Sequence, residues 1–191
     1  MILLIDNYDS FSYNLVQLIG TIAKEEIKVI RNDEMTVDDV EALAPEYIIL
    51  SPGPGRPRDA GICEDVVKQM QGKSRIIGVC LGHQSICEVY GATITYAKEL
   101  MHGKQSLADI DQAEEIFAGL PKQISVARYH SLAADPETMP ECLKVIATTA
   151  DGEVMAIRHK DYEIYGLQFH PESVLTPDGE TILRNFLGGN K

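Results

Sequence analysis

The first half of the chain alternates short apolar runs with segments of helical periodicity, and this alternation limits the possible folds more than any other feature. Strand-like runs occupy 2–5, 28–30, 47–50 and 76–79. Apolar residues recur at helical spacing in the segments that follow these runs, at 11–22, 37–43, 66–70 and 86–90. Repeated strand–helix order favours a parallel sheet with helices on both faces. Thr36 is a candidate N-cap for the second helix, and Asp9 or Ser10 for the first.

The second half is richer in strands. We predict strands at 124–127, 143–148, 154–157 and 164–169, and a closing helix through 182–187. Asp151-Gly152 suits a hairpin turn between two of these strands. The sequence therefore predicts an α/β fold with a mostly parallel central sheet and an antiparallel extension in the C-terminal half. A length of 191 residues suits one domain, spanning 1–191.

Charge and cysteine usage exclude several classes of function. The formal net charge of −12 repels nucleic acid and anionic membranes, so neither is expected as a partner. No apolar run approaches the ~20 residues that span a bilayer. The first residues lack the features of a secretion signal, and the four cysteines form no C-x-x-C pair. We expect a cytoplasmic protein with reduced thiols and no zinc site.

The segment Gly78-Val-Cys-Leu-Gly82 lies where a predicted strand meets a predicted helix. It has the form of the nucleophile elbow of serine hydrolases, with cysteine at the centre. A sharp turn there holds the nucleophile in a strained backbone position, and the following helix N-terminus favours a thiolate. The alternative is a buried Cys80 between two glycines that serve packing alone.

His170 is a candidate base for such a nucleophile. It follows the last predicted strand, in Gly166-Leu-Gln-Phe-His-Pro-Glu172, and Pro171 stops the strand ladder there. Glu172 lies two residues on and can hold the imidazole tautomer, as the acid of a triad does. The alternative is a surface histidine beside a solvated glutamate, and ninety positions separate His170 from Cys80.

The loop Ser51-Pro-Gly-Pro-Gly55 follows a predicted buried strand. Acyl transfer needs backbone N–H donors directed at a developing oxyanion, and glycine permits the backbone angles that direct them. By itself the loop is equally a rigid turn without a ligand.

Two of these segments together, Gly78-Val-Cys-Leu-Gly-His-Gln84 and Gly166-Leu-Gln-Phe-His-Pro-Glu-Ser173, resemble the class I glutamine amidotransferases in order and spacing. The resemblance extends over nearly the whole chain and implies that family's flavodoxin-like fold. Four shorter segments narrow it to the small subunits of anthranilate synthase and aminodeoxychorismate synthase. These segments are Asp6-Asn-Tyr-Asp-Ser-Phe11, Ser51-Pro-Gly-Pro-Gly55, His102-Gly-Lys104 and Arg128-Tyr-His-Ser-Leu132.

The resemblance implies a role for each matching residue. Cys80, His170 and Glu172 match the catalytic triad of a glutaminase. The matching glutamine-binding and oxyanion positions are Gly53, Pro54, Gly55, Leu81, Gln84, Ser131 and Leu132. In the family, Gly53 and Leu81 supply the oxyanion hole, and the loop 7–10 lies near the partner interface.

The resemblance also implies a substrate and a partner. L-glutamine is hydrolysed through a thioester on Cys80, and the ammonia passes to a chorismate-binding synthase subunit. No cofactor is expected in the glutaminase subunit. The segment Gln105–Gln112 departs from the family, which usually continues Thr-Ser and then His-Asp-Gly after His102-Gly-Lys104. Because of this difference, the resemblance does not predict whether that segment docks or couples to a partner.

The sequence leaves other functions open as well. A cysteine peptidase or a hydrolase of γ-glutamyl compounds can use the same fold, and so can a non-catalytic regulatory subunit. Anthranilate synthase and aminodeoxychorismate synthase use similar glutaminases, so the resemblance does not choose between them, nor against one subunit shared by both.

Overall fold

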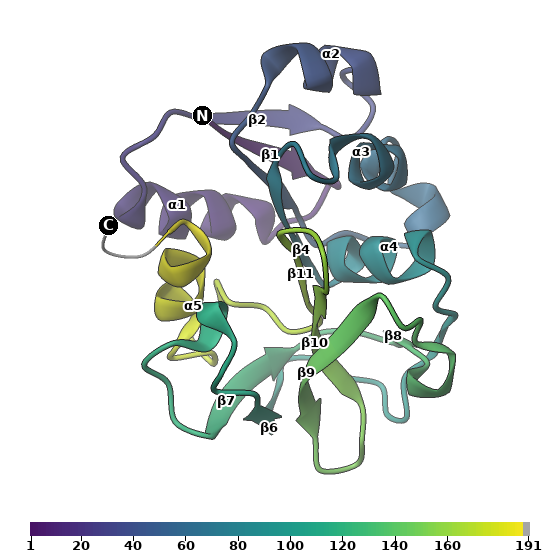
Figure 1. Ribbon diagram of the computed structural model, residues 1–191. Helices are drawn as coiled ribbons and strands as arrows, with labels where there is room; N and C mark the ends of the chain where they lie inside the picture. The colour runs from purple at the N-terminus through teal and green to yellow at the C-terminus, as the bar shows by residue number, and fades with distance from the viewer. Residues whose placement is uncertain (189–191) are drawn as a thin grey trace.

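The computed structural model describes residues 1–188 and is built around one nine-stranded sheet (Figure 1). Its strand order is β2-β1-β3-β4-β11-β10-β9-β6-β7. The strands are β1 (Ile2–Asp6), β2 (Ile27–Arg31), β3 (Tyr47–Leu50), β4 (Arg75–Val79), β6 (Lys104–Ile110), β7 (Gln123–Arg128), β9 (Leu143–Thr149), β10 (Val154–His159) and β11 (Ile164–Leu167). A separate two-stranded sheet pairs β5 (Ile94–Tyr96) with β8 (Leu132–Ala134).

The sheet is parallel in one half and antiparallel in the other. β2, β1, β3, β4 and β11 run parallel, whereas β11, β10, β9, β6 and β7 pair antiparallel. β9 and β10 form the predicted hairpin, with Gly152 at a φ of 82° in the turn. The predicted mixed sheet is therefore confirmed, and β11 is the strand that joins its two halves.

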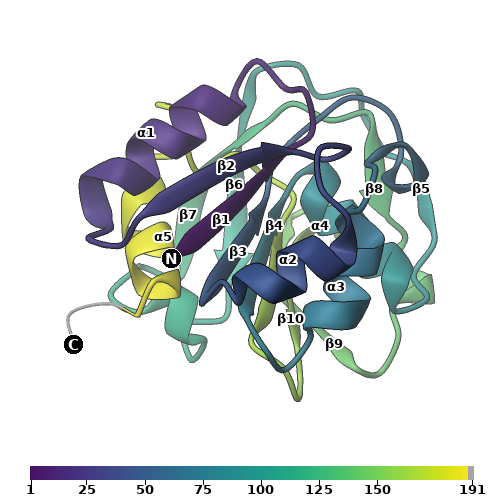
Figure 2. The same cartoon turned by 90° about the horizontal axis from the view of Figure 1, so that it is seen from above.

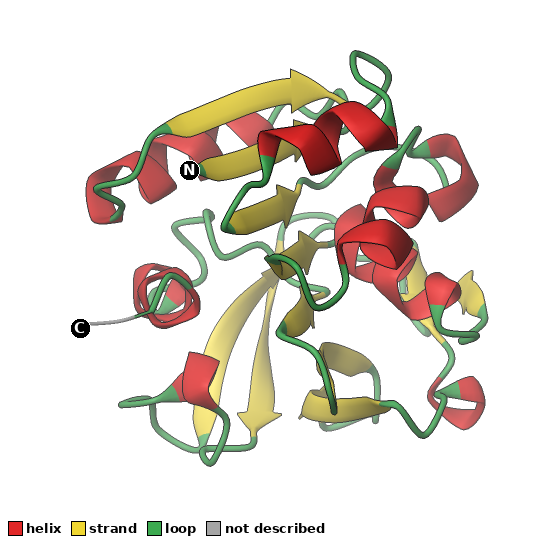
Figure 3. Ribbon diagram, turned by 45° about the horizontal axis from the view of Figure 1, so that its top comes forward, coloured by secondary structure: helices red, strands yellow, loops and turns green. Residues whose placement is uncertain are grey.

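Helices cover both faces of the sheet, as predicted (Figures 2 and 3). The helices are α1 (Ser12–Ile22), α2 (Val37–Leu43), α3 (Cys63–Met70), α4 (Leu81–Val89) and α5 (Gly179–Phe186), with short 3-10 turns at Pro57–Asp59, Glu115–Phe117 and Pro136–Thr138. α1 and α5 pack on one face, and α2, α3 and α4 on the other.

The two faces explain why the parallel strands are apolar along their whole length. In β1, Ile2 and Leu4 belong to the core beneath α1 and α5, and Leu3 and Ile5 to the core beneath α2, α3 and α4. Successive strand residues point to opposite faces, so a strand covered on both sides has no solvent-facing position. All five residues of β1 are buried.

The predicted helix caps have different outcomes. Thr36 caps α2 as predicted, because its hydroxyl accepts from the backbone N–H of Asp39 and the Asp39 carboxylate accepts in return. The predicted cap of α1 by Asp9 or Ser10 is wrong. Phe11 occupies the N-cap position without a side-chain cap, and the Asp9 carboxylate accepts from the backbone N–H of Phe11, which lies just before the helix.

The strand predictions were wrong at one boundary and missed three strands. The strand predicted at 164–169 ends at Leu167, so His170 lies beyond the strand rather than at its end. The strands β5, β6 and β8 were not predicted. β6 combines exposed polar residues with only two buried positions, Ala108 and Ile110, so its apolar pattern is weak.

α4 lies unusually close to the sheet where β4 ends. A Cβ atom on Gly78 would lie 2.3 Å from the backbone carbon of Gly82, and one on Gly82 would lie 2.4 Å from the backbone oxygen of Leu50. No side chain fits at either position, so both glycines of the elbow motif are steric requirements. This contact lets α4 begin directly after β4.

No helix within residues 1–188 has the length and apolar character needed to cross a bilayer.

Gly78→Ala should destabilise the fold by roughly 2–3 kcal/mol, because the added methyl group meets backbone that cannot move aside. The matched control is Gly20→Ala in α1, where the nearest atom is 4.0 Å from the added Cβ. That change should stabilise the protein by about 0.5–1 kcal/mol, since alanine favours helix. Urea unfolding midpoints measure both, and equal stability of the two variants would contradict the steric argument.

Candidate active site

Cys80 occupies the N-cap position of α4, immediately after β4. Its φ of 52° and ψ of −100° are rare for a residue with a side chain. The backbone N–H of Cys80 donates to the carbonyl of Leu167 at 2.8 Å, and its carbonyl accepts the first helical bond from Gln84 at 3.0 Å. The predicted strained turn is confirmed. The thiol lies at a helix N-terminus, where the N–H dipoles favour negative charge.

Three chain segments meet at the carboxyl ends of the parallel strands. They are the loop after β3, the start of α4 after β4, and the segment after β11. Ligands of open α/β sheets bind at this edge of the sheet. The topology therefore brings together residues that lie far apart in the sequence.

Backbone contacts with β7 hold His170 in place beyond its strand. Its N–H donates to the carbonyl of Ala127 at 3.0 Å. The hydroxyl of Thr176 donates to the carbonyl of His170 at 2.7 Å and accepts from the N–H of Ala127 at 2.9 Å. These three bonds close a ring, so the position of His170 does not depend on strand pairing.

His170 and Glu172 form a buried pair. Nδ1 of His170 lies 2.6 Å from Oε1 of Glu172, and the two side chains are 3% and 1% exposed. Burial lowers the pKa of His170, but interactions with Cys80 and then with Glu172 outweigh it and raise the pKa to about 10. The imidazole is therefore cationic at neutral pH, with Nδ1 bound by the carboxylate and Nε2 left for the sulfur.

The contact between His170 and Cys80 is looser than an ordinary hydrogen bond. Among the described residues, Nε2 of His170 has no partner within normal hydrogen-bond geometry, and Oε2 of Glu172 has none either. Catalytic hydrogen bonds are often long before substrate binds. The arrangement of acid, imidazole and thiol is that of an activated nucleophile.

Aromatic rings enclose the imidazole from the solvent side. The Tyr129 ring lies 5.0 Å from that of His170 and the Phe11 ring lies 5.8 Å away, both nearly edge-on. Neither aromatic residue was a predicted site residue. The rings limit the motion of His170 and contribute to its burial, since its side chain is 3% exposed.

A small cavity of about 200 Å³ opens beside Cys80. Six predicted binding residues line it with Cys80, namely Gly53, Pro54, Gly55, Gln84, Ser131 and Leu132. Tyr129 and His130 complete the lining. Leu81 is not a lining residue, but it is the first residue of α4, so its backbone N–H has no acceptor within the helix.

The loop that carries Gly53 is tied to the segment after β1. The Asn7 N–H donates to the hydroxyl of Ser51 at 2.8 Å, and the Asn7 side chain donates to the carbonyl of Ser51 at 2.8 Å. A Cβ atom on Gly53 would lie 2.5 Å from Cβ of Asn7, so only glycine fits. Backbone donors in this loop are thus held rigidly beside Cys80.

The other cysteines differ from Cys80 in their surroundings. Burial raises the pKa of Cys63 to about 12, and burial also raises the pKa of Cys87 far above its ordinary value. Cys142 is partly exposed, and all four thiols are free. Cys87 is fully buried inside α4 and packs as a core residue.

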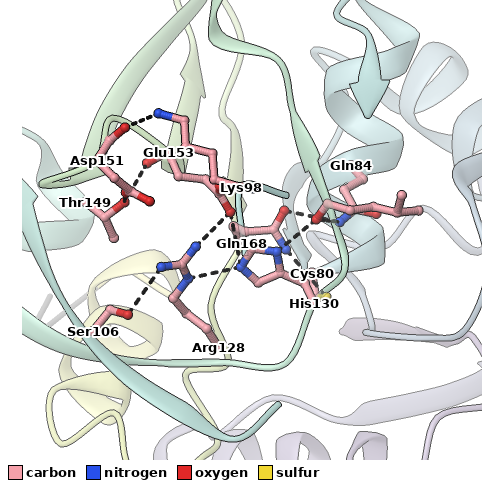
Figure 4. A network of polar contacts seen from close by, with 11 residues as sticks. Cys80, Gln84, Lys98, Ser106, Arg128, His130, Thr149, Asp151, Glu153 and Gln168 are labelled. Carbon is pink, nitrogen blue, oxygen red and sulfur yellow. Dashed lines mark hydrogen bonds and ion pairs between the residues drawn. The ribbon is translucent and has the colours of Figure 1, made fainter. Parts of the chain in front are cut away.

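A buried polar network stands behind the cavity (Figure 4). Arg128 is paired with Glu153 at 2.7 Å, and its Nε donates to His130 at 3.1 Å. Gln168 lies between Gln84 and Cys80 in the same network. Arg128 and Gln168 belong to segments that carry the family resemblance, but nothing in the sequence pattern indicates that Glu153 meets them.

Comparison with known proteins identifies similar chains. The sequence model of the family Glutamine amidotransferase class-I matches residues 3–189. The chain is 52% identical over 187 residues to "Aminodeoxychorismate/anthranilate synthase component 2" of Bacillus subtilis, covering 98% of this chain and 95% of that protein. It is 51% identical over 192 residues to "Anthranilate synthase component 2" of Pseudomonas aeruginosa, covering 98% of this chain and 94% of that protein.

A solved structure from Thermoplasma acidophilum has the same architecture. That protein is described as part of a GMP synthase, and it superposes with a TM-score of 0.87 at 26% identity, covering 98% of this chain and 92% of that chain. The α/β fold is therefore shared with that protein at low sequence identity.

Two buried histidines should make stability fall in mild acid. Burial lowers the pKa of His83 to about 3, and burial and Arg128 lower the pKa of His130 to about 4. Both folded values lie below the ordinary 6.5, so this stability is present above pH 6.5 and is lost as the pH falls toward the folded values. In His83→Leu, the pH slope of the unfolding free energy below pH 6.5 should decrease by about 1.4 kcal/mol per unit.

Urea unfolding at a series of pH values measures that slope. Ser85→Ala gives the control, since it alters a buried residue of the same helix without removing a titratable group and should leave the slope unchanged. Equal slopes in His83→Leu and the unaltered chain would show that burial does not lower the pKa of His83.

Proposed function

We propose a function from the premise that this chain belongs to the class I glutamine amidotransferases, whose sequence model matches residues 3–189. It acts as a glutaminase subunit that hydrolyses L-glutamine and delivers ammonia to a chorismate-aminating synthase subunit. The observation that carries the proposal is the interaction of Cys80, which lines the small cavity, with the buried His170–Glu172 pair. Two relatives about half identical to the chain are component 2 proteins of anthranilate and aminodeoxychorismate synthases.

In the first chemical step, the Cys80 thiolate attacks the δ-carbonyl of glutamine in the cavity. The backbone N–H groups of Gly53 and Leu81 stabilise the oxyanion, a role supported by the rigid loop and by the free N–H at the helix start. The His170 imidazolium then gives its proton to the leaving ammonia, and a glutamyl thioester remains on Cys80. Glu172 keeps Nδ1 occupied, so Nε2 is the atom that transfers the proton.

In the second step, neutral His170 removes a proton from a water molecule, which attacks the thioester and releases glutamate. Gln84, Ser131 and Leu132 hold the α-amino and carboxylate groups of glutamine at the far end of the cavity. Protein groups and water suffice for both steps, so we expect no cofactor in this subunit.

The partner covers the other side of His170. A larger cavity of about 710 Å³ adjoins the site there. Its lining combines Phe11 and residues of α1 with Tyr129 after β7 and the segment after β11, namely Phe11, Asn14, Gln17, Leu18, Thr21, Tyr129, His170, Glu172, Ser173 and Val174. Val174 is 93% exposed and Phe11 is 37% exposed, so this lining presents apolar groups to solvent. Coverage by a synthase subunit would bury them, and that subunit would receive the ammonia that leaves the glutamine amide beside His170.

The proposal has two versions, in which the partner synthase makes either anthranilate or aminodeoxychorismate. The Bacillus subtilis relative carries both component 2 names, whereas the Pseudomonas aeruginosa relative carries only the anthranilate name. We favour anthranilate synthase, with aminodeoxychorismate synthase or a shared role as the alternative.

The segment Gln105–Gln112, whose sequence differs from the family pattern, contains most of β6, an interior strand of the sheet. Leu107 in this segment is 58% exposed.

Cys80→Ser should abolish glutaminase activity in a folded subunit, with a loss of at least about a thousandfold. The change is nearly isosteric, but a serine hydroxyl is far less acidic than a cysteine thiol and does not ionise near neutral pH. Glutamate release measures the loss. External ammonia should still support synthesis by the partner, because only ammonia delivery is removed. Glutamine-dependent synthesis by Cys80→Ser would refute the role of Cys80.

The partner is identified by mixing the subunit with each candidate synthase subunit, chorismate and glutamine. Anthranilate as the single product would establish the favoured assignment, aminodeoxychorismate alone would establish the alternative, and both would establish a shared subunit. Product analysis by chromatography distinguishes them. Glutamine hydrolysis without either product would leave the glutaminase standing and overturn the chorismate assignment.

A further inference from the structure

Gln168 contacts the sulfur of Cys80 without being part of the triad. It follows β11 and its side chain is fully buried. Its Nε2 donates to Sγ of Cys80 at 3.6 Å, and its Oε1 accepts from Nε2 of Gln84 at 3.1 Å (Figure 4). A buried amide thus directs an N–H at the reacting atom.

The orientation of this amide is determined by its neighbours. Nε2 of Gln84 also donates to the carbonyl of Leu132 at 3.0 Å. A carbonyl can only accept, so the Gln84 nitrogen must face Leu132, and it then also faces the oxygen of Gln168. The Gln168 nitrogen is left facing the sulfur. A flip of either amide would place two acceptors or two donors against each other.

The Leu132 carbonyl is fixed in turn by His130. Nδ1 of His130 lies 2.9 Å from that carbonyl, and Nε2 accepts from Nε of Arg128 at 3.1 Å. Arginine has no acceptor, so Nε2 carries no proton and Nδ1 donates. Burial, followed by the charge of Arg128, lowers the pKa of His130 to about 4, which keeps this tautomer neutral.

A buried ion pair anchors the network. The side chains of Arg128 and Glu153 are 2% and 3% exposed, and Oε2 of Glu153 accepts from the N–H of Lys98 at 3.1 Å. Arg128 also donates to the hydroxyl of Ser106 at 3.2 Å. The guanidinium therefore has little freedom to move away from His130.

We propose that Gln168 is a further catalytic residue, which donates a hydrogen bond to the Cys80 sulfur and stabilises its thiolate. Arg128, Glu153 and His130 are positioning residues, because they act through Leu132 and Gln84 on the orientation of the Gln168 amide. This inference rests on the proposed function, in which Cys80 is the nucleophile. A donor to the charged form of a group favours that form.

Several charged or titratable groups surround the Cys80 and Gln168 side chains. The test must separate their effect on the Cys80 thiolate from that of the Gln168 amide. Those after β11 are His170 and Glu172, and Asp9 lies near that pair on the loop after β1. His130 lines the cavity, with Arg128 and Glu153 behind it, and His83 of α4 is buried with its pKa lowered to about 3. Changing Gln168 to an uncharged residue alters none of these charges.

The test is the pH dependence of Cys80 alkylation by iodoacetamide on the full chain. Mass spectrometry of the Cys80 peptide separates it from the partly exposed Cys142. Gln168→Met removes the donor at similar volume and should move the midpoint of the profile upward by about one pH unit, which is about tenfold slower alkylation below the midpoint. An unchanged midpoint would overturn the proposal.

Ser85→Ala is the matched control. Ser85 is fully buried in α4 and donates to the carbonyl of Leu81, so its loss removes a buried hydrogen bond close to the site without touching the sulfur. Its alkylation midpoint should equal that of the unaltered chain. A shift equal to that of Gln168→Met would mean that the profile reports general loosening, and the proposal would fall.

Gln168→Glu guards against loss of folding in the methionine variant. A carboxylate still accepts from Gln84, but it places a second acceptor against the sulfur. The midpoint should rise by more than in Gln168→Met. A midpoint at or below that of the unaltered chain would overturn the proposal.

Glu153→Gln tests the positioning residues. It keeps the shape of the side chain and removes the charge that holds Arg128. The midpoint should rise by less than in Gln168→Met, alongside any fall in melting temperature. A lower melting temperature with an unchanged midpoint would make the ion pair merely structural and overturn the positioning role.

These experiments use neither glutamine nor a partner. Failure of the proposed function would show separately, as absent glutamine hydrolysis by the unaltered subunit with its partner. Failure of the role of Gln168 would leave that hydrolysis intact and the alkylation profiles identical.

Discussion

The site depends on the close approach of α4 to the sheet. Gly78 and Gly82 leave no room for side chains between helix and strand, so the chain must turn within one residue. That residue is Cys80, whose φ of 52° costs about 1–3 kcal/mol for a residue with a side chain. Hydrogen bonds on both sides of it, to Leu167 and from Gln84, offset this cost. Leu167 ends β11 and Gln84 lies in α4, so these two elements hold the strained backbone of Cys80 in place.

The two halves of the sheet contribute different parts of the chemistry. The parallel half supplies Cys80 and the rigid loop around Gly53. The antiparallel half supplies the wall at Ser131 and, through β7, the backbone ring that holds His170. β11 pairs parallel to β4 and antiparallel to β10, so the segment that follows it reaches both halves. This is why residues ninety positions apart in the sequence meet at one sulfur.

Much of the fold follows from the sequence, and the exceptions have physical reasons. Strands buried on both faces, such as β1, are continuous apolar runs, whereas β6 is half exposed and gives no such signal. The elbow glycines and the triad lie in short motifs with direct steric or chemical requirements. Glu153 was missed because its partner Arg128 lies across the sheet, and no local pattern reports that pairing. The cap of α1 was misplaced because the Asp6 carboxylate accepts from the Ser12 hydroxyl and from the N–H of Asp9, and no local pattern reports these contacts.

The surroundings of His170 differ on its two sides, one suited to binding glutamine and the other to releasing ammonia. On the side of Cys80 is the small polar cavity proposed to hold glutamine, and on the other side is the apolar lining that includes Phe11, Leu18 and Val174. Ammonia that reaches water near neutral pH is protonated and is then no longer a nucleophile. In the proposed reaction the Nε2 proton of the cationic His170 goes to the leaving nitrogen, so ammonia forms beside a neutral imidazole. A partner seated on the apolar lining would exclude water at that position, and product release would then lead into the partner.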